Sequence, residues 1–128
     1  MCIRDSSSIA REVAQKIAEE AKKLIVGDPT DAATEVGPLI RHRETDRVEA
    51  WVNEAVAAGA ELLCGGKRIS DSCFEATVLL NPPSDCKVSQ AEIFGPVVCV
   101  YSVENVDAAI ARANDVPFSF QALSLIHI

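Results

Sequence analysis

The chain has 128 residues, of which 48% are hydrophobic and 24% are charged, and its formal net charge at pH 7 is −7. This length and composition predict one globular unit that can bury a core. The negative charge disfavours nucleic acid and anionic membranes as partners, and no apolar stretch approaches the roughly 20 residues that span a bilayer. The N-terminus also lacks the apolar run of a signal peptide. We therefore expect a cytoplasmic protein that binds neither nucleic acid nor membranes.

Two patterns of apolar spacing in the first half predict helices. The first helix begins near Ile9, after a candidate serine cap at residues 6–8, and stops before Gly27. Its inward face is expected to contain Ile9, Val13, Ile17 and Leu24. After a loop, the second helix starts near residues 41–45 and ends at Gly59. Its apolar side is expected to contain Val48, Trp51, Val52 and Ala55.

The second half of the chain contains three apolar runs that predict strands, at Leu62–Cys64, Thr77–Leu80 and Val97–Val103. The last run is apolar almost throughout, as expected for a strand that is covered on both faces. A third helix is predicted over Glu104–Asn114, with Val106, Ile110 and Ala113 inward, and a final strand starts over Phe118–Ala122. Helices that alternate with strands through short links predict an α/β fold.

The cysteines are widely spaced and form no C-x-x-C pair; they are Cys2, Cys64, Cys73, Cys86 and Cys99. An odd number without a regular spacing is typical of a reducing compartment, where cysteines serve as small hydrophobic residues. The two histidines, His42 and His127, are not paired at helical spacing. We therefore expect no metal site.

The most informative motif is Glu92-Ile93-Phe94-Gly95-Pro96, which precedes the last apolar run. In an extended segment, positions i and i+2 point to the same side, so Glu92 and Phe94 are expected to face one ligand. Gly95 is expected to allow a sharp turn, and Pro96 to fix the backbone before the strand. A carboxylate beside a flat ring suits a ribose that carries an aromatic base. A surface Glu and a core Phe that flank a turn form the alternative interpretation.

Seven segments of the sequence, in their order and spacing, resemble the catalytic domain of the aldehyde dehydrogenase superfamily. They are Val26–Pro29, Glu35–Ile40, Arg47–Val52, Ala58–Gly66, Ala76–Leu80, Glu92–Val98 and Ala109–Asn114 with Pro117-Phe118. The resemblance runs from about Ile9 to Ala122. It implies helices layered on a largely parallel sheet, and an enzyme that oxidises an aldehyde to a carboxylic acid with NAD or NADP.

The resemblance also implies roles for individual residues. Glu92 is expected to accept hydrogen bonds from the two hydroxyls of the nicotinamide ribose, and Phe94 to pack near the nicotinamide, so that both position the cofactor. Glu44 and Arg47 fall where the family has polar contacts near the nicotinamide, but the residue types at these positions vary and we assign them no role. The expected partner is a small aldehyde substrate, and the full-length parent is expected to be a homo-oligomer.

The implied reaction needs a cysteine that attacks the aldehyde, a glutamate base that activates water, and an asparagine that stabilises the oxyanion. In the family, all three lie N-terminal to the helix that begins here near Ile9. Cys2 is not a candidate nucleophile, because it lies too close to Ile9. No G-x-G-x-x-G motif occurs either. We therefore assign no catalytic residue and expect the chain alone to be inactive.

The two ends do not continue the family pattern. We interpret residues 1–8 as a non-family leader, 9–122 as a partial catalytic domain, and 123–128 as a non-family tail. Both ends resemble translated adapter sequence, so the chain is expected to be a fragment of a longer gene, with a natural short protein as the alternative. Two other functions stay open: a non-catalytic binding or interaction module that reuses the same layer, and part of a relative that transfers the acyl group to coenzyme A.

Overall fold

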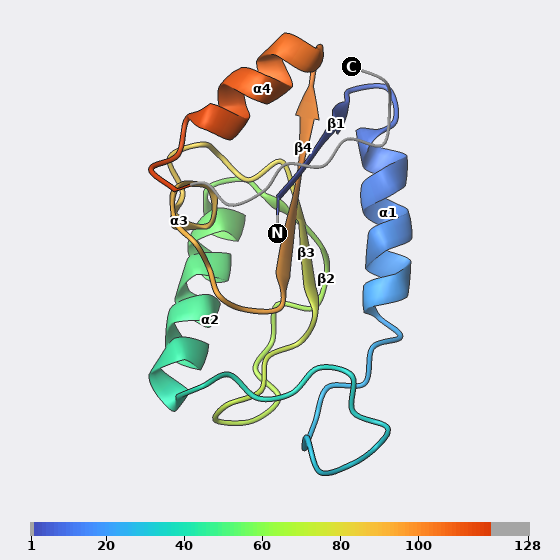
Figure 1. Cartoon of the computed structure of the whole chain (residues 1–128), viewed down its shortest axis with the longest axis vertical. Helices are drawn as coiled ribbons and strands as arrows, with labels where there is room; N and C mark the ends of the chain where they lie inside the picture. The colour runs from blue at the N-terminus through green and yellow to red at the C-terminus, as the bar shows by residue number, and fades with distance from the viewer. Residues whose placement is uncertain (1, 119–128) are drawn as a thin grey trace.

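The computed structural model describes residues 2–118, apart from the side chains of Cys2, Arg4 and Asp5. Within this part, helices and strands are interspersed along the chain and pack as an α/β fold, which confirms the predicted fold class (Figure 1). The elements are β1 (Cys2–Ser6), α1 (Ala10–Ala21), α2 (His42–Ala57), β2 (Glu61–Cys64), β3 (Thr77–Leu80), α3 (Lys87–Gln90), β4 (Val97–Val103) and α4 (Val106–Asn114). None of the described helices is long and apolar enough to cross a membrane.

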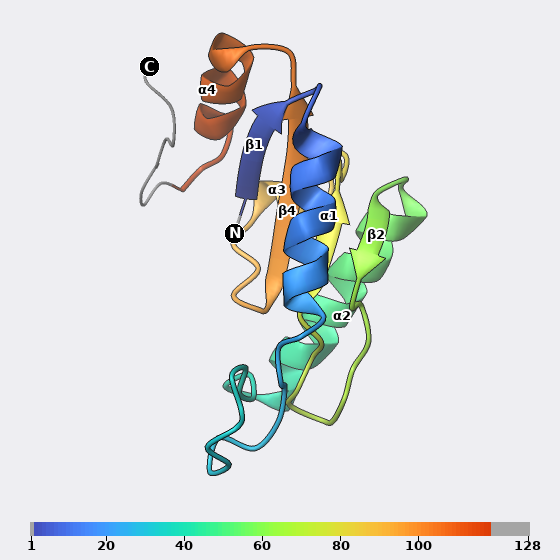
Figure 2. The same ribbon diagram turned by 90° about the vertical axis from the view of Figure 1, so that its right-hand side faces the viewer.

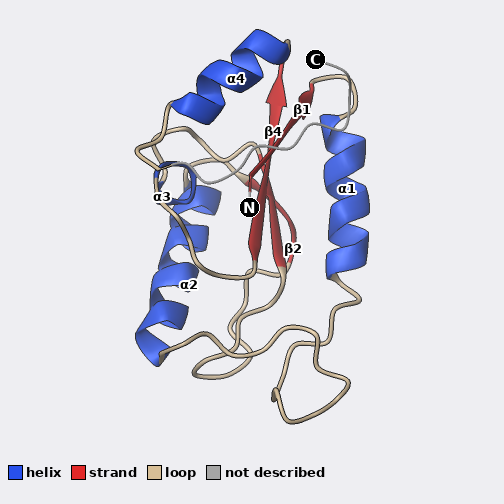
Figure 3. Ribbon diagram, in the orientation of Figure 1, coloured by secondary structure: helices blue, strands red, loops and turns tan. Residues whose placement is uncertain are grey.

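The strands form one sheet in the order β1-β4-β3-β2. β4 pairs in parallel with both β1 and β3, whereas β2 pairs antiparallel with β3. Figure 2 shows α1 in front of the sheet, and Figures 1 and 3 show α2 and α3 on the opposite side. The sheet therefore lies between two helical layers, and its central strands β3 and β4 are mostly buried, as is usual for parallel strands.

Alternate residues of the two central strands, β3 and β4, belong to two hydrophobic cores on opposite faces of the sheet. On β3, Leu79 joins the core under α2, whereas its neighbours Val78 and Leu80 join the core under α1. On β4, Cys99 faces α2 and Val100 faces α1. Successive side chains of a strand point to opposite faces, so a strand covered on both faces must be apolar throughout. Val97–Tyr101 show this pattern, and the prediction of a strand covered on both faces is confirmed for this part of β4.

The buried face of α1 differs from the prediction. The predicted serine cap is wrong, because the residue before the helix is Ile9 and no side chain caps the first turn. Ile9 is 46% exposed, and the buried positions of the helix are Ala10, Ala14 and Ala18. Small side chains allow the helix backbone to approach the sheet closely, and the larger apolar residues of this helix lie at the margin of the contact. The predicted buried face of α2 agrees better with the structure, because three of its four predicted residues, Val48, Val52 and Ala55, are buried.

The inward face predicted for the last helix is also wrong. α4 contains no buried residue, and Val106 and Ile110 are 43% and 47% exposed. The sequence did not predict β1 or the single turn of α3. The strand predicted over Phe118–Ala122 lies outside the described residues, except for Phe118, which belongs to no strand.

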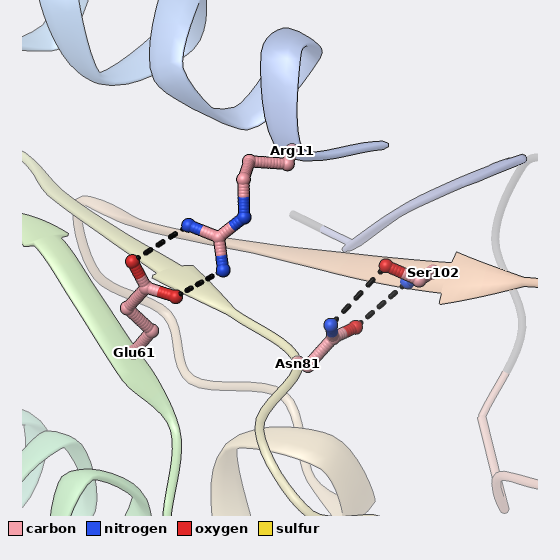
Figure 4. A network of polar contacts seen from close by, with 4 residues as sticks. All are labelled: Arg11, Glu61, Asn81 and Ser102. Atoms are coloured by element: carbon pink, nitrogen blue, oxygen red, sulfur yellow. Dashed lines mark hydrogen bonds and ion pairs between the residues drawn. The ribbon is translucent and has the colours of Figure 1, made fainter. Parts of the chain in front are cut away.

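Polar side chains join elements that are distant in sequence (Figure 4). Arg11 on α1 donates two hydrogen bonds to the Glu61 carboxylate on β2, at 2.9 and 2.7 Å. Asn81, just after β3, donates to the Ser102 hydroxyl at 3.1 Å and accepts from the Ser102 amide at 2.7 Å. These paired contacts join α1 to β2 and the end of β3 to β4 on the surface of the molecule.

The turn after β2 predicts a clear mutational result. Gly65 has φ +71°, and a Cβ there would lie 2.3 Å from the Ala76 carbonyl oxygen. Gly59 has φ +109°, but a Cβ there would meet nothing within 4 Å. Both Gly→Ala changes introduce backbone strain of about 1 kcal/mol or more, whereas only Gly65→Ala adds a collision with the backbone of the neighbouring segment.

We therefore expect Gly65→Ala to lower the free energy of unfolding by at least about 1 kcal/mol more than Gly59→Ala does. Denaturant titration followed by circular dichroism measures both values. Equal losses would contradict the close approach at Gly65.

Candidate functional site

The Glu92–Pro96 segment lies between α3 and β4 and leads directly into the sheet. The Thr77 amide at the start of β3 donates to the Pro96 carbonyl oxygen at 2.8 Å. Since β3 and β4 are parallel, the segment emerges at the amino ends of both strands. The structure therefore anchors its C-terminal end firmly, and residues 92–94 project from that anchor.

The exposure of the segment alternates from one residue to the next. Glu92 is exposed, Ile93 is buried, and the Phe94 side chain is 75% exposed. Among the described residues, the Glu92 carboxylate has no hydrogen-bond or ion-pair partner. A carboxylate with free acceptor sites and a bare ring therefore flank one buried side chain. The carboxylate can only accept hydrogen bonds, and the ring offers an apolar face. The pair therefore fits a ligand that carries both hydroxyl groups and a flat ring.

The turn in this segment is formed differently from the prediction. Phe94, not Gly95, has a left-handed backbone, with φ +42°. A non-glycine residue in this region costs about 1–2 kcal/mol, and such strain is concentrated at functional sites. Gly95 is needed for another reason, because a Cβ there would lie 2.8 Å from Cγ2 of Val48 on α2. The segment is therefore not extended throughout, and it presses against α2.

A polar network from α2 holds the middle of the segment. Arg47 Nη2 donates to the Ile93 carbonyl oxygen at 2.7 Å. Arg47 Nε donates to the Glu44 carboxylate at 2.9 Å, and the guanidinium lies 4.6 Å from the centre of the Trp51 ring. The sequence assigned no role to Glu44 or Arg47. The helical spacing of 44, 47 and 51 places the three side chains on one face, but only the fold brings them to Ile93.

Three ionisable groups have pKa values that their surroundings shift: Glu44 at the site, and Cys64 and Cys86 in the cores. The hydrogen bond from Arg47 lowers the pKa of Glu44, and Arg43 contributes in the same direction. Burial raises the pKa of the Cys64 and Cys86 thiols. A raised pKa keeps a thiol protonated and unreactive at neutral pH. These two cysteines are therefore packing residues in the structure.

No other constellation in the described part of the chain competes with this segment. Among the described residues, no three His, Cys, Asp or Glu side chains gather where they could hold a metal ion. A shallow hollow of about 440 Å³ lies elsewhere and includes neither Glu92 nor Phe94. It is lined by Ser84, Ala111, Arg112, Asn114 and Asp115. The candidate site is therefore an exposed segment and not a closed pocket.

Comparison with known proteins gives the class to which this fold and segment belong. The model of the aldehyde dehydrogenase family matches residues 5–124. The chain is 42% identical over 107 residues to a 3-sulfolactaldehyde dehydrogenase of Priestia aryabhattai. That alignment covers 84% of this chain and 22% of the relative. The chain therefore belongs to the aldehyde dehydrogenase family, and it spans about a fifth of the length of this relative. The boundaries at 9 and 122 stay a prediction.

Solved structures share the fold over most of the chain. An aldehyde dehydrogenase of Mycobacterium tuberculosis, complexed with NAD⁺, superposes with a TM-score of 0.82 at 33% identity. The glyceraldehyde-3-phosphate dehydrogenase of Methanocaldococcus jannaschii, complexed with NADP, superposes with a TM-score of 0.82 at 35% identity. Each alignment covers 90% of this chain and 25% of the other chain. The resemblance to the aldehyde dehydrogenase superfamily is thereby confirmed.

The backbone at Phe94 predicts an order of stability among substitutions. Asn tolerates the left-handed region better than Ala does, because its short polar side chain bonds locally. We expect the free energy of unfolding of Phe94→Asn to exceed that of Phe94→Ala by about 0.5–1 kcal/mol, although both variants lack the ring. Equal stability of the two variants, measured by denaturant titration, would mean that Phe94 is not held at positive φ.

The Glu44–Arg47 ion pair predicts a pH dependence of stability. Because the pKa of Glu44 is lower in the folded chain than in the unfolded chain, its stabilising effect is fully present above the unfolded pKa of about 4.3. It is lost as the pH falls through the lower, folded pKa. The difference in unfolding midpoint between the wild type and Glu44→Gln should therefore be largest near pH 6–7 and shrink below about pH 4. Thermal unfolding at a series of pH values measures it, and a constant difference down to pH 3 would contradict this role.

Proposed function

We propose that this chain is a segment of an NAD(P)-dependent aldehyde dehydrogenase that oxidises aldehydes to carboxylic acids. In this role, Glu92 and Phe94 receive the nicotinamide half of the cofactor. The observation that carries the proposal is the exposed pair itself: a carboxylate that has no partner in the described part of the chain, and a bare ring, on either side of buried Ile93. The family match over residues 5–124 and the NAD⁺ and NADP complexes of similar structures support it.

The two side chains have complementary tasks in this proposal. The Glu92 carboxylate accepts hydrogen bonds from the two ribose hydroxyls, and charge-assisted bonds of this kind are the stronger ones. The Phe94 ring provides an apolar wall that restricts the position of the nicotinamide. When bound, the cofactor supplies the hydride acceptor of the reaction. Both residues therefore orient the reacting ring and take no part in bond chemistry.

The chain contributes no nucleophile in this proposal. The four cysteines whose side chains are described are buried, and burial keeps the thiols of Cys64 and Cys86 protonated. Cys86 and Cys99 belong to the hydrophobic core under α2, and Cys64 to the core under α1. The thiol and the base of the family reaction are therefore assigned to other parts of a longer enzyme.

Glu92→Gln in the full-length dehydrogenase that carries this segment tests the proposal. The amide retains the shape of the side chain but removes the charge from two hydrogen bonds to the ribose. Charge-assisted bonds are worth about 1.5–3 kcal/mol each, so we expect cofactor affinity or the hydride-transfer rate to fall about tenfold or more. Titration with NADH or NADPH by fluorescence and single-turnover kinetics measure the two quantities.

Glu104→Gln is the matched control, because it removes an exposed carboxylate at the opposite end of β4. It should change neither quantity by more than about twofold, as expected for a surface substitution. Cofactor affinity and hydride transfer that are both unaffected by Glu92→Gln would refute the role of this residue.

A further inference from the structure

We propose that the hydroxyl groups of Ser89 and Tyr101 position the Glu92–Pro96 segment, because the hydrogen bond between them closes the stretch of chain that contains it. This inference rests on the proposed function of Glu92 and Phe94. The direct observation is the 2.9 Å hydrogen bond between Ser89 Oγ on α3 and the Tyr101 hydroxyl on β4. The bond joins positions 12 residues apart in the sequence, and the whole segment lies between them.

Tyr101 is the fixed end of this bond. Its side chain is 2% exposed and belongs to the core under α2. The guanidinium of Arg112 on α4 lies 3.9 Å from the centre of the Tyr101 ring, where a cation is attracted to the aromatic face. The backbone of β4 is paired with β1 on one side and with β3 on the other. The Tyr101 hydroxyl therefore has a defined position, and the bond holds Ser89 to it.

The other end of the bond lies on α3, which depends on tertiary contacts for its orientation. A helix of four residues is not stable by itself. The buried side chains of Cys86 and Val88 hold α3 against the core, but apolar burial is not directional. The exposed polar contacts at the two ends of the helix contribute little, as is usual on a surface. The directional bond from half-buried Ser89 is therefore expected to restrict the rotation of α3 most strongly.

The orientation of α3 determines how the chain enters the segment. Ala91 alone separates Glu92 from the last residue of the helix. The Ala91 amide donates to the carbonyl oxygen of the first helical residue at 2.9 Å, so Ala91 moves with the helix. Glu92 is exposed, and its side chain has no core packing that would resist a displacement. A rotation of α3 would therefore displace the Glu92 carboxylate.

The bond completes a segment that is attached to the sheet at both ends. At the C-terminal end, the Thr77 amide donates to the Pro96 carbonyl oxygen at 2.8 Å. At the N-terminal end, the bond between Ser89 and Tyr101 ties α3 to β4. A loop that is closed at both ends has fewer conformations than a loop that is closed at one. Without the second attachment, residues 92–94 have more conformations, and the carboxylate and the ring are less often in their common position.

The next residue of β4, Ser102, provides a matched control. Its hydroxyl accepts a hydrogen bond from the Asn81 side chain at 3.1 Å. Asn81 directly follows β3, so this bond joins two strands that already pair with each other and does not involve α3. Tyr101→Phe and Ser102→Ala therefore each remove one hydroxyl from β4, but only Tyr101→Phe releases α3.

The first experiment is a double-mutant cycle in the full-length dehydrogenase that carries this segment, with NADH and NADPH affinity measured by fluorescence titration. Tyr101→Phe and Ser89→Ala should each weaken binding about fivefold, which is the effect of one hydrogen bond. The double variant should bind no more weakly than either single variant, because both changes remove the same bond. Ser102→Ala should change the affinity less than about twofold.

The same titration in the Glu92→Gln background separates positioning from a general structural effect. There, Tyr101→Phe should weaken binding less than it does in the wild type, because the carboxylate that the bond positions is already altered. Additive losses in the first cycle, an equal loss in Ser102→Ala, or an undiminished loss in the Glu92→Gln background would overturn the proposal.

The second experiment does not depend on the cofactor. The amides of residues 89–91 are hydrogen-bonded within the turn of α3, so their hydrogen exchange reports its opening. In the ligand-free enzyme, mass spectrometry should show about fivefold faster exchange of these amides in Tyr101→Phe and Ser89→Ala, and no change in Ser102→Ala. Unchanged exchange in the first two variants would refute the positioning role.

The two experiments together distinguish this inference from the proposed function. If exchange becomes faster but Glu92→Gln binds NADH and NADPH like the wild type, the hydroxyl pair holds α3 and the proposed function of Glu92 falls. If Glu92→Gln weakens binding and exchange is unchanged in Tyr101→Phe and Ser89→Ala, the proposed function stands and the role of the hydroxyl pair falls.

Discussion

The burial of β3 and β4 on both faces is the constraint on which the rest of the structure depends. Adjacent residues of β3 belong to different cores, with Leu79 under α2 and Val78 under α1. A shift of either strand by one residue would exchange the two faces, so the register is strongly determined. This register fixes where β4 begins, and with it the position from which residues 92–96 approach α2.

Within the candidate site, one residue anchors the segment and its two neighbours stay exposed. The Ile93 side chain packs in the core, and its carbonyl oxygen accepts a hydrogen bond from Arg47. Neither contact involves the side chain of Glu92 or Phe94. Those two side chains stay outside and available to a ligand. A site in which the anchoring groups and the binding groups are different atoms of adjacent residues is preorganised, because the binding groups need not be released from internal contacts first.

The sequence predicts those features that depend on local pattern. The bounds of β3 and β4 follow from continuous apolar runs, and the exposure of Glu92 follows from its charge. The fold determines the rest. The buried face of α1 consists of alanines, which are too weakly hydrophobic to mark it in the sequence. The apolar residues of α4 predict a buried face, although they are exposed. The left-handed backbone of Phe94 contradicts its residue type, and the bond from Arg47 spans too many residues for any local pattern to reveal it.

The alanine face of α1 limits how this part of the family can diverge. Ala10, Ala14 and Ala18 are buried on the side of the helix that faces the sheet, and because protein interiors are closely packed, we expect larger side chains there to force the layers apart. Selection at these three positions therefore acts on side-chain size more than on hydrophobicity, and Ser or Gly would be accepted more readily than Leu. Two descendants of this sequence could differ widely in polarity along the helix and still keep the same spacing between their layers.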